Sequence, residues 1–206
     1  MRGPTIFGGY WNRPADDQPF LADGWLDTGD LGRIDADGLM WVTGRANELI
    51  KRGGHGIEPS VIEDALIAHE SVALAAAVGK PDAYAGELPV VYVQLHPNRT
   101  ADLKILLAFA AGRIRERAAI PNEIFVLPSL PVTAVGKVHK QTLKADVTSR
   151  AVRDLLAQRL GLGSASVEVE QHPLHGLVAD VRVPVDQDET VFEALGTLPV
   201  KVVVES

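Results

Sequence analysis

From about Asn47 onward the sequence alternates between strand-length apolar runs and helical patterns, and this alternation limits the possible folds more than any other feature. The apolar runs span residues 72–78, 88–95 and 123–127. Helical patterns occupy residues 59–69 and residues 101 to about 119. We place a turn at residues 79–82 (GKPD), directly after the first run. Three strands with two helices between them predict a compact α+β domain with a small three-stranded sheet over residues 47–145.

The segments on either side of this domain have different patterns. Residues 1–46 are rich in turn signals and include a predicted hairpin, in which residues 31–34 and 39–43 flank the turn DADG. A helix is predicted from Thr142 to about Leu160, with Gly161 as its C-cap. Residues 146–206 as a whole are interpreted as a small α/β appendage of unknown role.

Composition excludes several classes of function. The net charge is −7, which leaves no broad basic field for nucleic acid. The chain has no cysteine, so disulfides, thiolate metal sites and cysteine nucleophiles are excluded, and we expect no metal site in this chain. No apolar run approaches the roughly 18–20 residues that a transmembrane helix needs, and the start lacks the pattern of a signal peptide. We therefore expect a cytoplasmic location.

Residues 24–32 (GWLDTGDLG) form the first cluster that could carry chemistry. Flanking glycines allow the backbone to approach a ligand, and the carboxylate of Asp30 could accept hydrogen bonds from two hydroxyls, such as those of a ribose. On spacing alone the alternative is favoured, namely that Asp27 and Asp30 cap turns.

Residues 44–57 (GRANELIKRGGHGI) form the second cluster, and residues 130–140 (LPVTAVGKVHK) form the third. The second combines basic side chains with glycines and could bind phosphate, although on its own an ordinary solvated basic loop is slightly favoured. In the third, Lys137 follows Gly136 and offers a flexible ammonium group. This is not a Walker phosphate loop, because the required glycine spacing is absent.

Taken together, the clusters resemble successive signature motifs of the adenylate-forming superfamily of acyl-CoA synthetases, peptide-synthetase adenylation domains and luciferases. The resemblance covers about residues 3–145 in the order of the family. It rests on four segments: residues 3–11, residues 24–30, residues 44–54, and the pattern P-x-T-x-x-G-K at 131–137. The amino-acid sequences at residues 51–55 and 134–137 are most similar to those of bacterial acyl-CoA synthetases.

The resemblance implies a function. Members of the family activate a carboxylic acid with ATP to an acyl-adenylate, and acyl-CoA synthetases then transfer the acyl group to CoA. By the match, Asp30 holds the ribose hydroxyls, Arg45 contacts the same nucleotide, and Lys137 reaches the reacting carboxylate and the α-phosphate. An ammonium group in a water-poor site would stabilise the charge that develops there.

The resemblance also implies a rotation of the small domain, with Asn47 as the hinge, where the family more often has Asp or Lys. Gly53, Gly54 and His55 match the loop that lines the pantetheine channel, and Arg52 is a candidate contact for CoA phosphates. The cofactors implied are ATP, CoA and Mg²⁺, the last held mainly by the large domain of the family. The implied partners are a carboxylic acid and that large N-terminal domain.

The phosphate loop, the adenine segment and the acyl pocket of the family have no match in this sequence. We therefore expect residues 1–46 to be the end of the large domain and the chain to be a C-terminal fragment, inactive alone. Two alternatives remain open: a peptide-synthetase adenylation domain, and a non-catalytic interaction module in which the motifs are relics.

Overall fold

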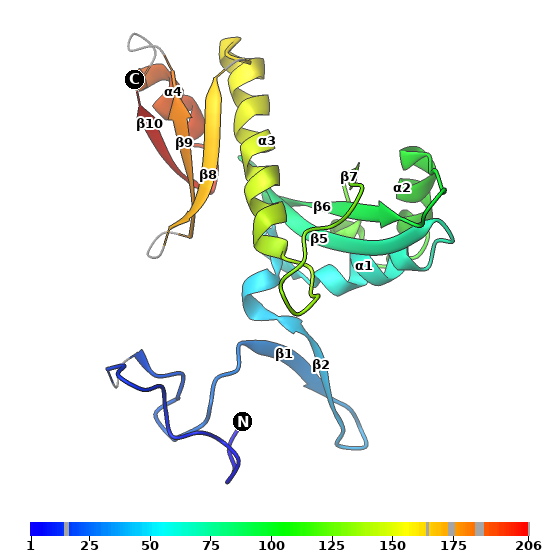
Figure 1. Ribbon diagram of the computed structural model, residues 1–206, viewed down its shortest axis with the longest axis vertical. Coiled ribbons are helices and arrows are strands. Elements are labelled where there is room, and N and C mark those ends of the chain that lie inside the picture. Colours follow the sequence, from blue (N-terminus) through cyan, green and yellow to red (C-terminus); the bar gives the residue numbers. More distant parts are fainter. Residues whose placement is uncertain (15–16, 164, 173–175, 184–187, 206) are drawn as a thin grey trace. The chain divides into compact units, whose positions relative to one another are not determined.

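The computed structural model describes residues 1–14, 17–163, 165–172, 176–183 and 188–205, and these residues form two compact units, Met1–Glu48 and Leu49–Ser206 (Figure 1). Among the described residues, no helix is both long and apolar enough to cross a membrane.

The first unit contains an antiparallel hairpin of β1 (Asp30–Ile34) and β2 (Met40–Arg45), followed by a short 3₁₀ helix at Ala46–Glu48. The turn is organised by the Asp35 carboxylate, which accepts hydrogen bonds from the backbone of Asp37 and Leu39 and from the Trp41 indole. These hydrogen bonds, the indole bond foremost, lower the pKa of Asp35 below its ordinary value. The predicted hairpin is therefore present, with strands slightly longer than expected.

The second unit begins with a five-stranded sheet. Its elements, in chain order, are β3 (Ile50–Arg52), β4 (His55–Ile57), α1 (Pro59–Ile67), β5 (Val72–Asp82), β6 (Gly86–Leu95), α2 (Leu103–Ala111), a 3₁₀ helix (Arg117–Ala119) and β7 (Glu123–Val126). The strand order is β4-β3-β6-β5, and β7 pairs in parallel with β6. The three predicted strands are all present, and the short strands β3 and β4 extend the sheet beyond the prediction.

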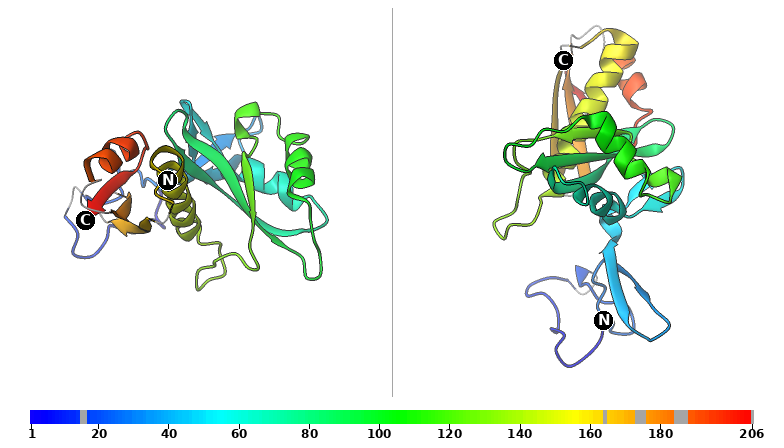
Figure 2. Two further views of the ribbon diagram at one scale, coloured as in Figure 1. Left: turned by 90° about the horizontal axis from the view of Figure 1, so that it is seen from above. Right: turned by 90° about the vertical axis from the view of Figure 1, so that its right-hand side faces the viewer.

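Both faces of this sheet are buried. Ala75, Ala77, Val91 and Val93 face α1 and α2, while their neighbours Ala76, Val78, Val90 and Tyr92 face α3 (Lys140–Leu160). Figure 2 shows α3 on one side of the sheet and α1 and α2 on the other. Because alternate residues of a strand point to opposite faces, a strand covered on both sides needs a continuous apolar run, which explains residues 72–78 and 88–95.

Two details of the prediction are wrong. The turn between β5 and β6 lies at residues 83–85, not at 79–82, because Gly79 and Pro81 are paired residues within β5 and the Asp82 carboxylate accepts hydrogen bonds from Tyr84 and Ala85. The helix expected over residues 101–119 ends at Ala111, where Gly112 forms its C-cap. The chain then buries Ile114 in the core before the separate 3₁₀ turn.

The C-terminal part of the second unit shares α3 with the five-stranded sheet. Val152 and Leu156 of α3 pack on a second sheet that is also covered by α4 (Asp188–Leu195). Its strands are β8 (Ser166–His172), β9 (Gly176–Arg182) and β10 (Lys201–Glu205), in the order β10-β9-β8. Ser149 and Arg153 of α3 both donate hydrogen bonds to the carbonyl of Val167 in β8. One continuous helix therefore contributes to two hydrophobic cores, and Figure 1 shows α3 next to both sheets.

Candidate functional site

Asp30 and Arg45 are directly paired across the β1–β2 hairpin. Their Cα atoms are register partners, and Arg45 Nε lies 2.9 Å from Asp30 Oδ1. Arg45 Nη1 also donates a 3.0 Å hydrogen bond to the carbonyl of Thr28. Both side chains are partly exposed, so their surface can still reach a ligand. The structure thus brings together the two residues that were expected to contact one nucleotide.

Asn47 lies in the 3₁₀ helix that follows β2, next to the division between the two compact units after Glu48. It is exposed and forms an interaction within the described chain. Its position therefore suits a residue that absorbs a backbone change, which is how a hinge works.

Gly53 and Gly54 form the two-residue turn between β3 and β4. The pair Arg52 and His55 closes this turn, and both glycines have positive φ angles, 55° and 84°. A turn of this kind requires positive φ at both positions, which glycine adopts without steric cost. The glycines are explained by the turn itself, and the turn exposes its backbone for contact with a thin ligand.

Next to this turn lies an open pocket of about 350 Å³, lined by Arg52, Gly53, His55, Arg117 and Ala118. Arg52 Nη1 donates a 2.8 Å hydrogen bond to the carbonyl of Ala118, which ties the hairpin to the 3₁₀ helix Arg117–Ala119. Arg117 was not among the residues identified from the sequence. No local sequence pattern distinguishes Arg117, because only the folded chain brings it to the pocket beside the Gly53–Gly54 turn.

Lys137 is exposed at the end of a tight loop. Thr133 N donates a 2.7 Å hydrogen bond to the Lys137 carbonyl, Lys137 N donates to Thr133 Oγ1, and Val132 and Val138 form an isolated β-bridge. Within the described residues, the Lys137 side chain has no hydrogen bond or ion pair. The backbone at Lys137 is therefore held while its ammonium group is available to a ligand.

A partly buried hydrogen-bond network anchors the helix that follows this loop. The Tyr92 hydroxyl on β6 donates a 2.6 Å hydrogen bond to Asp146 of α3, and Arg150 Nε donates 2.7 Å to the same carboxylate oxygen. Burial, together with the bond to Asp146, raises the pKa of Tyr92. Burial alone would raise the pKa of Asp146, but the bonds from Arg150 and Tyr92 lower it below its ordinary value.

The family follows from comparison with known proteins. Residues 61–137 match the family described as AMP-binding enzyme C-terminal domain. This part of the chain is an AMP-binding enzyme C-terminal domain. The matched segment contains β5, β6, α2, β7 and Lys137 at its end.

The relatives that match most of this chain are CoA ligases of the adenylate-forming superfamily. The marinolic acid–CoA ligase of Pseudoalteromonas sp. is 49% identical over 156 residues, which cover 76% of this chain and 24% of that protein. The long-chain-fatty-acid–CoA ligase of Bacillus subtilis is 36% identical, covering 72% of this chain and 26% of that protein. The chain spans about a quarter of the length of these relatives.

Solved structures agree with the sequence comparison. ATP-bound MatB from Rhodopseudomonas palustris is 30% identical with a TM-score of 0.68, covering 73% of this chain and 30% of that one. The o-succinylbenzoate CoA synthetase MenE from Bacillus subtilis, solved with an acyl-adenylate, is 34% identical with a TM-score of 0.64, covering 69% and 29%. The α+β class and the adenylate-forming relationship expected from the sequence are confirmed.

Proposed function

We propose that this chain supplies the mobile catalytic part of an ATP-dependent acid–CoA ligase of the fatty-acyl-CoA synthetase type. In the first half-reaction a carboxylate attacks the α-phosphorus of ATP and pyrophosphate leaves. In the second, the thiol of CoA attacks the acyl carbonyl and AMP leaves. The activity requires a large nucleotide-binding domain as a partner, because the matches cover about a quarter of the CoA ligases.

The observation that carries this proposal is the setting of Lys137. Its backbone is held by Thr133, its ammonium group is exposed, and it lies in a different compact unit from Asp30 and Arg45. We assign to Lys137 the stabilisation of charge on the reacting carboxylate and α-phosphate. Asp30 would accept hydrogen bonds from the ribose hydroxyls, with Arg45 beside it on the same nucleotide.

For the second half-reaction, we assign the exposed Gly53–Gly54 turn and His55 to the pantetheine arm of CoA. Arg52 and Arg117, which line the adjoining pocket, supply positive charge for the CoA phosphates. Asn47 is assigned as the hinge, with residues 1–46, 47–145 and 146–206 as the end of the large domain, the small catalytic domain and the appendage.

Mg²⁺ is the metal ion that the family resemblance implies. No group of three or more His, Cys, Asp or Glu side chains in the described ranges could hold a metal ion. As the resemblance implies, we assign Mg²⁺ mainly to the large domain, and we assign no step of the reaction to a metal bound by this chain.

The test uses an assembled ligase, in which the full chain replaces the matching segment of a relative such as the marinolic acid–CoA ligase. Pyrophosphate release is measured with ATP and a panel of acids that includes a long-chain fatty acid and indoleacetate, and acyl-CoA is measured after CoA is added. We expect acid-dependent pyrophosphate release and then thioester formation. Absence of both, when the relative's own segment supports them in the same assay, overturns the proposal and favours an interaction module.

A further inference from the structure

Glu87, near the start of β6, makes a side-chain contact with the neighbouring strand β3. Its Oε2 atom accepts a 2.7 Å hydrogen bond from the backbone N–H of Lys51 in β3, 36 positions earlier in the chain. Lys51 stands two residues before the Gly53–Gly54 turn. A side chain of the AMP-binding C-terminal domain thus holds the strand that leads into the proposed CoA loop.

This contact adds to the few backbone hydrogen bonds that join β3 to β6. β3 and β6 share a single register pair, Arg52 with Gly86, next to which Gly53 N donates a 2.7 Å hydrogen bond to the Ala85 carbonyl. β3 is three residues long. Burial of Ile50 and Ile57 fixes the base of the hairpin, and the charge-assisted bond from Lys51 to Glu87 adds a strong contact closer to the turn.

The Glu87 carboxylate occupies space that a side chain at position 79 would fill. Gly79 lies on the neighbouring strand β5, and a Cβ atom built at Gly79 would lie 2.5 Å from Cδ and Oε2 of Glu87. Gly79 has no positive φ angle, so its backbone does not require glycine. The missing side chain at position 79 leaves room for the carboxylate to turn toward Lys51.

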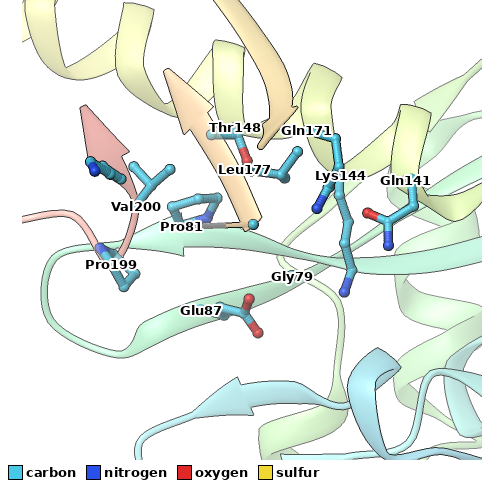
Figure 3. Close-up of a pocket in the computed structure, with 12 residues that line it drawn as sticks. Gly79, Pro81, Glu87, Gln141, Lys144, Thr148, Gln171, Leu177, Pro199 and Val200 are labelled. Atoms are coloured by element: carbon cyan, nitrogen blue, oxygen red, sulfur yellow. The ribbon is translucent and has the colours of Figure 1, made fainter. Parts of the chain in front are cut away.

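The Glu87 carboxylate also borders a pocket of about 290 Å³, where β5 and β6 meet α3 and the β8–β10 sheet (Figure 3). Lys144 of α3 lines the same pocket. Glu87 is not among the residues that line the pocket of His55 and Arg117, and its hydrogen bond to Lys51 N connects it to the strand before the turn.

From this arrangement we propose that Glu87 is a positioning residue for the second half-reaction: it orients the Gly53–His55 turn for the pantetheine arm of CoA by holding Lys51. The inference rests on the proposed CoA ligase function. It makes the effect of Glu87 specific to CoA, because Lys137 has no hydrogen bond or ion pair with Glu87 among the described residues.

Two substitutions disturb the contact in different ways. Glu87→Ala removes the acceptor. Gly79→Ala keeps Glu87 but places a methyl group where its carboxylate lies. Glu87→Gln keeps an acceptor oxygen and serves as the conservative rescue. Lys51 is exposed, so water can replace the lost acceptor and the fold is expected to survive. Glu70→Ala, at an exposed glutamate outside this network, is the matched control.

The functional measurement is thioester formation by the assembled ligase from supplied acyl-adenylate, at varied CoA concentration. We expect Glu87→Ala and Gly79→Ala to raise KM for CoA about fivefold, the size expected from one lost hydrogen bond. Adenylate formation, measured as pyrophosphate release, should stay within about twofold of wild type. Glu87→Gln should recover most of the CoA affinity, and Glu70→Ala should match wild type.

A direct structural measurement uses the 206-residue chain itself. Amide hydrogen exchange at Lys51 should be about tenfold faster in Glu87→Ala and Gly79→Ala than in wild type, because the protecting bond is lost. Unchanged KM for CoA, or an equal loss of both half-reactions, overturns the inference even if Lys51 exchange changes. If the wild-type ligase itself forms no thioester, the proposed function fails, which is a distinguishable result.

Discussion

Thr133 and Lys137 are bonded to each other twice through the backbone of Lys137. The Thr133 N–H donates 2.7 Å to the Lys137 carbonyl, and the Lys137 N–H donates 3.2 Å to Thr133 Oγ1. Gly136, with a φ of 79°, allows the chain to turn between them. This loop holds the root of the Lys137 side chain and leaves its ammonium group exposed, which is what a cation that must approach a separately held nucleotide requires.

Lys137→Ala in the assembled ligase should reduce pyrophosphate release about 100-fold or more, because the cation at the developing negative charge is lost. Thioester formation from supplied acyl-adenylate should remain near wild type. The matched control is Lys104→Ala, at an exposed lysine on α2. Equal loss of both half-reactions in Lys137→Ala would refute the role assigned to this residue.

Asp30→Asn should raise KM for ATP about tenfold, because the amide loses one acceptor for the ribose hydroxyls and the charge that holds Arg45. The free energy of unfolding should change by less than about 1 kcal/mol, since exposed ion pairs contribute little. Asp37→Asn, at an exposed position in the same hairpin, is the control. A large loss of stability with unchanged KM for ATP would instead assign Asp30 a structural role.

Arg117→Ala should raise KM for CoA about tenfold, because charge-assisted bonds to phosphate are strong. The same variant should use pantetheine, which lacks the nucleotide phosphates, as well as wild type does. Arg115→Ala is the matched control, because Arg115 is an exposed arginine two positions away that does not line the pocket. If Arg117→Ala impairs pantetheine and CoA equally, the pocket does not bind phosphate.

Tyr92→Phe should lower the free energy of unfolding by about 1–2 kcal/mol near neutral pH, because it removes the hydrogen bond to Asp146. The folded-state pKa of Tyr92 is raised, so the contribution of this tyrosine is complete below about pH 10, the ordinary tyrosine pKa, and is lost as the pH rises further. The stability difference between wild type and Tyr92→Phe should therefore shrink above about pH 10.

Urea unfolding at about pH 8 and about pH 10.5 measures this difference. Tyr84→Phe is the control, because Tyr84 is fully exposed at the β5–β6 turn. The free energy of unfolding of Tyr84→Phe should fall above about pH 10 by the same amount as that of wild type. An identical pH dependence for wild type and Tyr92→Phe would show that the ionisation of Tyr92 does not contribute.

The candidate site was only partly predictable. Asp30, Arg45 and Lys137 lie within short motifs, so neighbouring residues identify them. Arg117 and Glu87 were missed because their relevance depends on contacts far along the chain: Glu87 bonds Lys51 across 36 positions, and Arg117 reaches the Arg52 pocket from a 3₁₀ turn. The β5–β6 turn was misplaced because Gly79 and Pro81 are typical of turns, whereas the pairing of two long strands overrides that local preference.

The amino-acid sequence alone determined the apolar strands, the hairpin turn at residues 35–38 and the family motifs, because each depends on residues that are adjacent or regularly spaced. Only the tertiary structure decided that α3 would serve two cores through Val147 and Val152, and that Glu87 would hold the strand before the Gly53–Gly54 turn. These relationships depend on which surfaces bury each other. The free energy of burial depends on the apolar area removed from water and not on how far apart two residues are in the sequence.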